Sequence, residues 1–67
     1  MDWMEKIREV LRLDEEELAL WRDIAAEEAN PHVRAMIRAM IERERMEMED
    51  LRMLLRRGDY ERDPEDF

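Results

Sequence analysis

The chain has 67 residues with no cysteine, one glycine and two prolines, which allows one small domain and excludes disulfides and thiolate metal sites. Twenty acidic residues against 12 basic residues give a net charge of -8. This charge repels phosphate backbones and anionic lipid headgroups, so neither nucleic acid nor membrane is expected as a partner. No stretch approaches the roughly 20 apolar residues of a membrane span and no signal peptide is evident, so we expect a cytoplasmic protein.

The first predicted element is a helix over about residues 2–29. Asp2 is followed three residues later by Glu5, which resembles a capping box at a helix start. Asp14 with Glu17 three residues on is a second capping signal, so a helix broken at Asp14 stays open as an alternative. The dipeptide Asn30-Pro31 ends this first helix, because proline disfavours helical geometry in the residue before it.

The second predicted element is a helix over about residues 31–57. Asn30 is a good N-cap and Pro31 suits the first helical position, whereas Gly58 is expected to close the helix. Residues 58–67 are acidic and have too little apolar surface to offset the entropy cost of ordering them. We therefore predict a flexible acidic tail after a hairpin over residues 1–57.

The predicted fold class is all-α, an antiparallel two-helix hairpin. A connection this short leaves two helices only the antiparallel arrangement. A core of this size contributes only about 3–5 kcal/mol after chain entropy, so oligomerisation or a bound metal is the expected supplement. We therefore expect the hairpin to associate with itself, as a homodimer or a higher even oligomer, and to form a four-helix bundle.

Acidic residues interrupt the apolar face of both predicted helices. The first stripe consists of Ile7, Leu11, Asp14, Leu18, Trp21 and Ala25, with Glu17 bordering it. The second stripe consists of Val33, Ile37, Met40, Glu44, Glu47, Leu51 and Leu54. A hairpin that turns near residue 30 sets Asp14 opposite Glu47 and Glu17 opposite Glu44. The four acids are therefore expected at one level of the hairpin.

Carboxylates removed from water must be paired, protonated or bound to a cation, because desolvation and mutual repulsion oppose ionisation. If two hairpins meet across this face, eight carboxyl groups converge, and a pair of divalent cations would neutralise them compactly. The alternative is that the acids point to solvent or pair with arginines such as Arg8, Arg38, Arg45 and Arg52, with Asp14 only a cap. Serine and threonine are absent, which excludes hydroxyl nucleophiles.

The spacing of these residues resembles that of a known family. Asp14 precedes Trp21 by seven residues, Glu44 precedes Glu47 by three, and 30 residues separate Asp14 from Glu44. Over about residues 10–55 this pattern is similar to the ferritin-like superfamily, most closely to the single-hairpin type of encapsulated ferritins and of each rubrerythrin half. The ligand types depart from that family, because aspartate, glutamate and tryptophan stand where glutamate, histidine and tyrosine are usual.

The resemblance implies a di-iron ferroxidase site at a dimer interface. Glu44 would bridge the two irons, Asp14 and Glu47 would be terminal ligands, Trp21 would line the site, and Glu17 could replace Asp14, whose side chain is shorter. Without the histidine the donors are all oxygen, which suits iron, Mn, Mg or Ca. The tail does not resemble a targeting peptide, so loading into an encapsulin shell is not predicted. The alternative function is a metal-free structural or interaction bundle with a decayed site.

Overall fold

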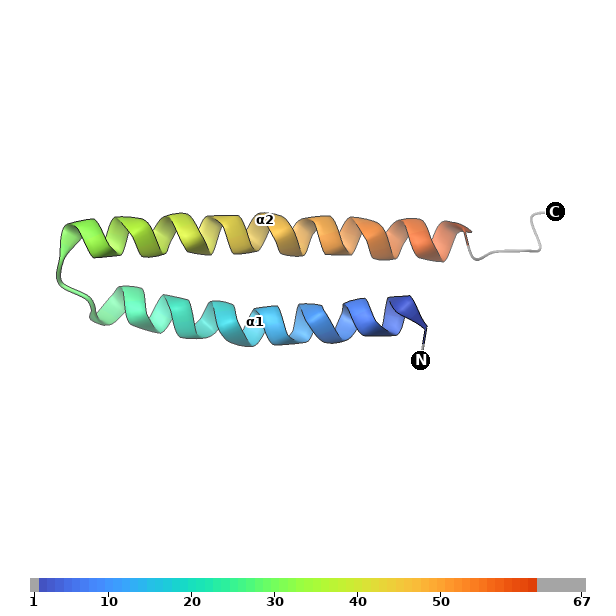
Figure 1. Cartoon of the computed structure of the whole chain (residues 1–67), viewed down its shortest axis with the longest axis horizontal. Helices are drawn as coiled ribbons and strands as arrows, with labels where there is room; N and C mark the ends of the chain where they lie inside the picture. The colour runs from blue at the N-terminus through green and yellow to red at the C-terminus, as the bar shows by residue number, and fades with distance from the viewer. Residues whose placement is uncertain (1, 62–67) are drawn as a thin grey trace.

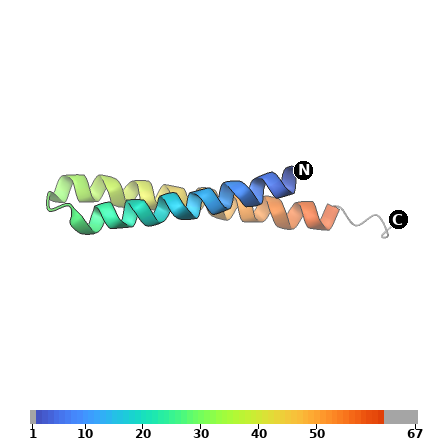
Figure 2. The same ribbon diagram turned by 90° about the horizontal axis from the view of Figure 1, so that it is seen from below.

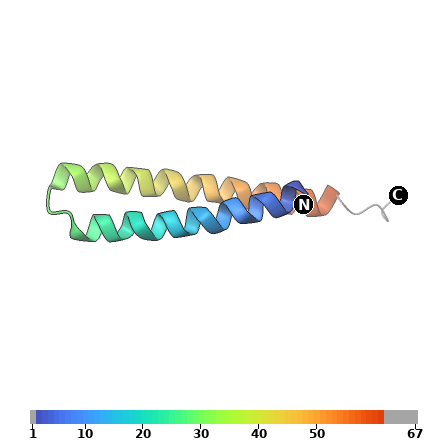
Figure 3. The same cartoon turned by 60° about the horizontal axis from the view of Figure 1, so that its bottom comes forward.

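The structure, a computed structural model, describes residues 2–61 as two helices, α1 (Trp3–Glu27) and α2 (Pro31–Glu61). The helices run antiparallel, so that the beginning of α1 lies beside the C-terminal part of α2 (Figure 1). They cross at a shallow angle (Figure 2) and remain together from the turn to the open end (Figure 3). The predicted all-helical hairpin is confirmed. Neither described helix carries a stretch apolar enough to span a membrane.

The helix starts follow the capping signals in the sequence. The Oδ1 of Asp2 accepts the backbone N–H of Glu5 at 2.9 Å, and the Oδ1 of Asn30 accepts those of His32 and Val33 at 2.9 and 3.2 Å. Both caps satisfy amides that have no partner inside the helix. Because α1 is continuous from Trp3 to Glu27, the alternative of a helix broken at Asp14 is wrong.

Gly58 does not end the second helix. It has no positive φ, and α2 continues to Glu61, so residues 58–61 of the expected tail are helical. A Cβ at Gly58 would lie 2.5 Å from the Sδ of Met4 and 2.5 Å from the Cη2 of Trp3. The glycine therefore lets the start of α1 pack closely on α2. Residues 62–67, where the rest of the flexible tail was expected, lie outside the described residues.

The contact between the helices, here called the seam, alternates steps of three and four residues on both helices. Its members, all buried or half-buried, are Met4, Ile7, Leu11, Asp14, Leu18, Trp21 and Ala25 on α1, Glu28 directly after α1, and Arg34, Ile37, Ile41, Glu44, Met48, Leu51, Leu55 and Gly58 on α2. Such a repeat, with a mean of 3.5 residues, is typical of a two-stranded coiled coil. Among the residues that the structure describes, the buried apolar side chains are Met4, Leu18, Ile37 and Met48.

The stripe predicted for the second helix is partly wrong, because it mixes two neighbouring faces of α2. Ile37, Glu44 and Leu51 lie in the seam, whereas Val33, Met40, Glu47 and Leu54 are exposed beside it. The reason is that both sets follow helical spacing, and each exposed member directly precedes a seam residue in the sequence. The sequence pattern alone therefore does not distinguish the buried set from its neighbour.

The two sides of the hairpin differ in character. On one side, arginines form ion pairs from helix to helix, Arg8 with Asp59 at 4.0 Å and Arg52 with Glu15 at 3.9 Å. The other side, here called the apolar face, exposes large apolar side chains around the acids. Its members are Val10, Leu13, Leu20 and Ile24 on α1 and Val33, Met40 and Leu54 on α2. This face is left without a covering element within the described residues.

Candidate metal centre

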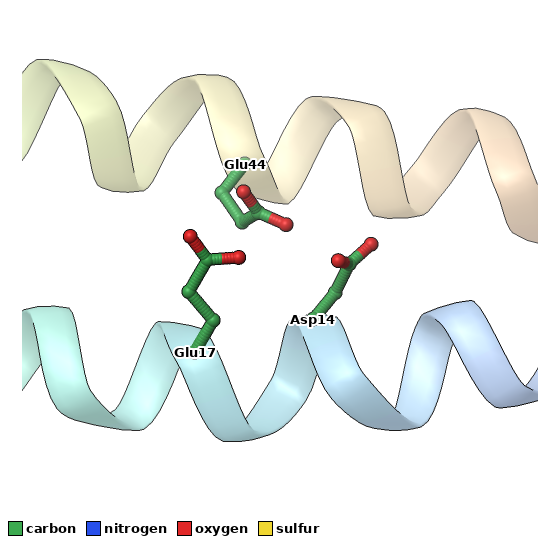
Figure 4. Close-up of side chains that lie close together, drawn as sticks. All are labelled: Asp14, Glu17 and Glu44. Atoms are coloured by element: carbon green, nitrogen blue, oxygen red, sulfur yellow. The ribbon is translucent and has the colours of Figure 1, made fainter.

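Three carboxylates from the two helices converge halfway along the hairpin. Oxygen atoms of Asp14, Glu17 and Glu44 all lie within 4.8 Å of one another. Figure 4 shows the side chain of Glu44 descending from α2 between those of Asp14 and Glu17 on α1. Asp14 and Glu44 are half-buried, whereas Glu17 is exposed. The cluster therefore opens onto the apolar face.

The coiled-coil repeat explains why these residues meet. Asp14 and Glu44 occupy seam positions, where every other side chain at mid-hairpin is apolar, so each must point toward the opposite helix. Glu17 follows Asp14 by one turn and stands on the neighbouring stripe. The sequence correctly placed Glu17 opposite Glu44, and the structure adds Asp14 to that pair.

Glu47 lies beside the cluster and not within it. It is exposed, and it lines two shallow hollows on the apolar face. One hollow, of about 160 Å³, also contains Glu17, Trp21, Met40, Arg43 and Glu44. The other, of about 420 Å³, also contains Val10, Asp14, Asp50 and Leu51. Glu47 thus shares a hollow with each of the three clustered acids on the apolar face.

The cluster is electrostatically uncompensated within the hairpin. Among residues 2–61, the ion pairs involve none of the four acids. Desolvation raises the pKa of Glu44 above its usual 4.5, repulsion from Asp14 and Glu17 adds to this, and a hydrogen bond with Asp14 acts in the same direction, as does Glu47. The seam therefore holds negative charge that a proton or a cation would stabilise.

Two further side chains border the acids. The indole Nε1 of Trp21 donates to the Oε2 of Glu17 at 3.4 Å, which links the expected aromatic residue to the cluster. Arg43 lines the smaller hollow, and the sequence reasoning missed it. The available signal was its position, three residues after Met40 and next to Glu44. This spacing places it on the stripe of α2 that also carries Val33, Met40, Glu47 and Leu54, here called the outer stripe.

The donor set fits a hard divalent cation. All four side chains offer carboxylate oxygens, and Asp14, Glu17 and Glu44 already lie close enough to share one ion. Carboxylates at this density favour Mg, Ca, Mn or iron, and none of these four donors is an imidazole or a thiolate, the ligands that favour zinc or copper.

No protein-family model, curated protein or solved structure was found to match this chain.

Proposed function

We propose that this chain is a ferritin-like metal-binding protein whose homodimer, a four-helix bundle, holds divalent cations between carboxylates of the two copies. Asp14, Glu17 and Glu44 are the ligands within one copy, and Glu47 joins them from the edge of the cluster. The observation that carries the proposal is the convergence of three carboxylates within 4.8 Å, two of them half-buried and one exposed, with no ion-pair partner among the described residues.

The size of the hairpin supports the dimer. Within the described residues only four apolar side chains are buried, fewer than a stable small domain needs. The helices run together for about 38 Å along α1 at 1.5 Å per residue, and the hairpin is 18 Å wide. A second copy on the apolar face would bury on the order of 700 Å² per copy, close to the value of about 800 Å² for standard stable interfaces.

The proposed cation replaces the missing positive charge. Like charges at this spacing oppose dimer formation when ionised, and a bound cation converts that repulsion into ligation. Iron bound there would supply a Fe(II)/Fe(III) couple, so Fe(II) oxidation by dioxygen, the ferroxidase reaction, is the proposed activity with this metal. The chain itself contributes the oxygen donors and the apolar surroundings that exclude water.

Thermal melting with Mn²⁺ or with Fe²⁺ under anaerobic conditions tests the proposal directly. A ligand bound only by the folded state stabilises by about 2.7 kcal/mol at one hundred times its dissociation constant. We expect the metal ion to raise the melting temperature of the native chain and to leave that of Glu44→Ala unchanged. Asp23→Asn, which removes an exposed acid of α1 outside the apolar face, is the matched control and should respond like the native chain.

The ferroxidase activity needs a separate measurement. Fe(II) is added to the dimer without oxygen, and air is then admitted while Fe(III) is followed by absorbance. Oxidation faster than in buffer alone, stoichiometric with the protein and absent from Glu44→Ala, supports the activity. Metal binding without faster oxidation would reduce the proposal to a non-redox metal site.

A metal-free interaction bundle is the second candidate function. The raised pKa of Glu44, caused mainly by desolvation, favours it, because a proton on Glu44 partly neutralises the cluster without any metal. Under this alternative, the dimer forms in the presence of a chelator and no divalent ion changes its melting temperature.

A further inference from the structure

The four residues that α1 contributes to the apolar face are arranged almost symmetrically about Glu17. Val10 and Ile24 lie seven residues to either side of it, and Leu13 and Leu20 lie four before and three after. Their exposed fractions are 42%, 45%, 49% and 63%, respectively. Steps of three and four residues place all five side chains on one stripe of α1. A stripe that is symmetric about its centre is self-complementary when two copies pack antiparallel about a two-fold axis.

Charges at the two ends of this stripe complete the symmetry. Lys6 stands eleven residues before Glu17, and Glu27 stands ten residues after it. Both side chains are exposed, and neither belongs to an ion pair within the described residues. Antiparallel pairing of two α1 helices centred on Glu17 would set each Lys6 beside the partner's Glu27, which gives one ion pair at each end.

The outer stripe of α2 has its own centre, between Arg43 and Glu44. Val33 and Leu54 lie ten residues outside this pair, and Met40 and Glu47 lie three residues outside it. In the structure, the carboxylates of Glu17 and Glu44 belong to the same cluster, so the centres of the two stripes lie at one level of the hairpin. One axis at that level therefore relates both helices to their copies.

We propose that a second copy covers the apolar face with α1 packed antiparallel on the partner's α1 and α2 on the partner's α2. The two-fold axis passes at the level of Glu17 and Glu44, Lys6 pairs with the partner's Glu27, and Arg43 faces the partner's Glu44. This inference rests on the homodimer of the proposed function and not on its metal. The other face-to-face arrangement, with α1 on the partner's α2, keeps Lys6 away from the partner's Glu27.

Charge exchange at Lys6 and Glu27 tests this orientation. The dimer dissociation constant is measured by analytical ultracentrifugation at low salt, with Mn²⁺ and with a chelator. We expect Lys6→Glu and Glu27→Lys each to weaken the dimer about tenfold, because two attractive contacts become repulsive. The double variant should return to within about threefold of the native value.

Net charge does not explain the expected pattern. Glu27→Lys reduces the negative charge by two from -8, so general repulsion between copies would fall and the dimer would tighten. Asp23→Lys makes the same change outside the apolar face and is the matched control, for which we expect no weakening. A double variant no tighter than the two single ones would overturn the proposed orientation.

Cross-linking gives a second test that does not depend on weak ion pairs. The native chain has no cysteine, so Glu17→Cys introduces one thiol near the proposed axis and should form a disulfide-linked dimer under mild oxidation. Met46→Cys, at an exposed position of α2 outside the apolar face, should cross-link far more slowly. Equal rates for the two variants would contradict the proposal.

The outcomes separate this inference from the proposed function. Mn²⁺ binding is read independently by equilibrium dialysis of the native chain. Charge exchange that behaves as expected without Mn²⁺ binding leaves the orientation standing and rejects the metal site. Mn²⁺ binding with no coupling between Lys6 and Glu27 supports the metal site and rejects the orientation. A chain that is monomeric both with Mn²⁺ and with a chelator also overturns the orientation.

Discussion

Carboxylate oxygens of Asp14 and Glu44, which come from different helices, lie within 4.8 Å of each other in the middle of the seam. Two ionised carboxylates this close repel each other, so a proton on Glu44 relieves the repulsion, and its pKa is raised accordingly. The contact therefore connects the stability of the hairpin to pH, and it identifies the level at which a cation would compete with that proton.

Acid should stabilise the metal-free protein. The pKa of Glu44 is raised in the folded state above the usual 4.5, so the folded state binds this proton more tightly than the unfolded state. Stability should rise as the pH falls from neutral through the raised pKa toward about 4.5. Melting in a chelator at a series of pH values measures this, and Glu44→Gln should melt higher than the native chain at neutral pH with a flatter profile.

The fluorescence of Trp21 should report cation binding. Its indole N–H donates to Glu17, so a cation that draws the Glu17 carboxylate away changes the surroundings of the ring. A Trp3→Phe variant leaves Trp21 as the only indole, because the chain has two tryptophans. We expect its emission to shift on titration with Mg²⁺. If the double variant Trp3→Phe and Glu17→Gln shows the same emission shift, the signal does not arise from the contact between Trp21 and Glu17.

Loss of the cap at Asn30 should destabilise the turn. Asn30→Ala removes the acceptor for the backbone N–H groups of His32 and Val33, which should lower the free energy of unfolding by about 1 kcal/mol. Asn30→Asp keeps an acceptor and should stay close to the native value. Urea denaturation at one fixed protein concentration makes the comparison, because dimer formation would otherwise change the apparent stability.

Gly58 should be coupled to Trp3. Alanine is the better helix former by about 1 kcal/mol, but its Cβ would overlap the side chains of Trp3 and Met4, and overpacking costs about 1–3 kcal/mol. Gly58→Ala should therefore destabilise the native chain by about 1 kcal/mol and cost less in a Trp3→Ala background. Thermal melting of the native chain, the two single variants and the double variant completes the cycle, and equal costs in both backgrounds would mean that the ring does not limit this position.

The sequence predicted the elements well because their signals are local. Asp2 and Asn30 have side chains that bond to amides two or three residues away, so their effect does not depend on the rest of the fold. Gly58 was misjudged for the opposite reason. A helix-ending glycine and a helical glycine have the same local signal, and the side chains that pack on Gly58 come from residues more than fifty positions earlier.

The candidate site was predictable in its residues but not in their arrangement. Helical spacing by itself determined that Asp14, Glu17, Glu44 and Glu47 lie near one level of an antiparallel hairpin, since both the period and the turn are encoded in the chain. Only the tertiary structure decided that Glu44 stands between Asp14 and Glu17 while Glu47 stays at the surface. The rotation of one helix against the other selects which of two adjacent stripes is buried, and that rotation is set by packing between residues distant in sequence.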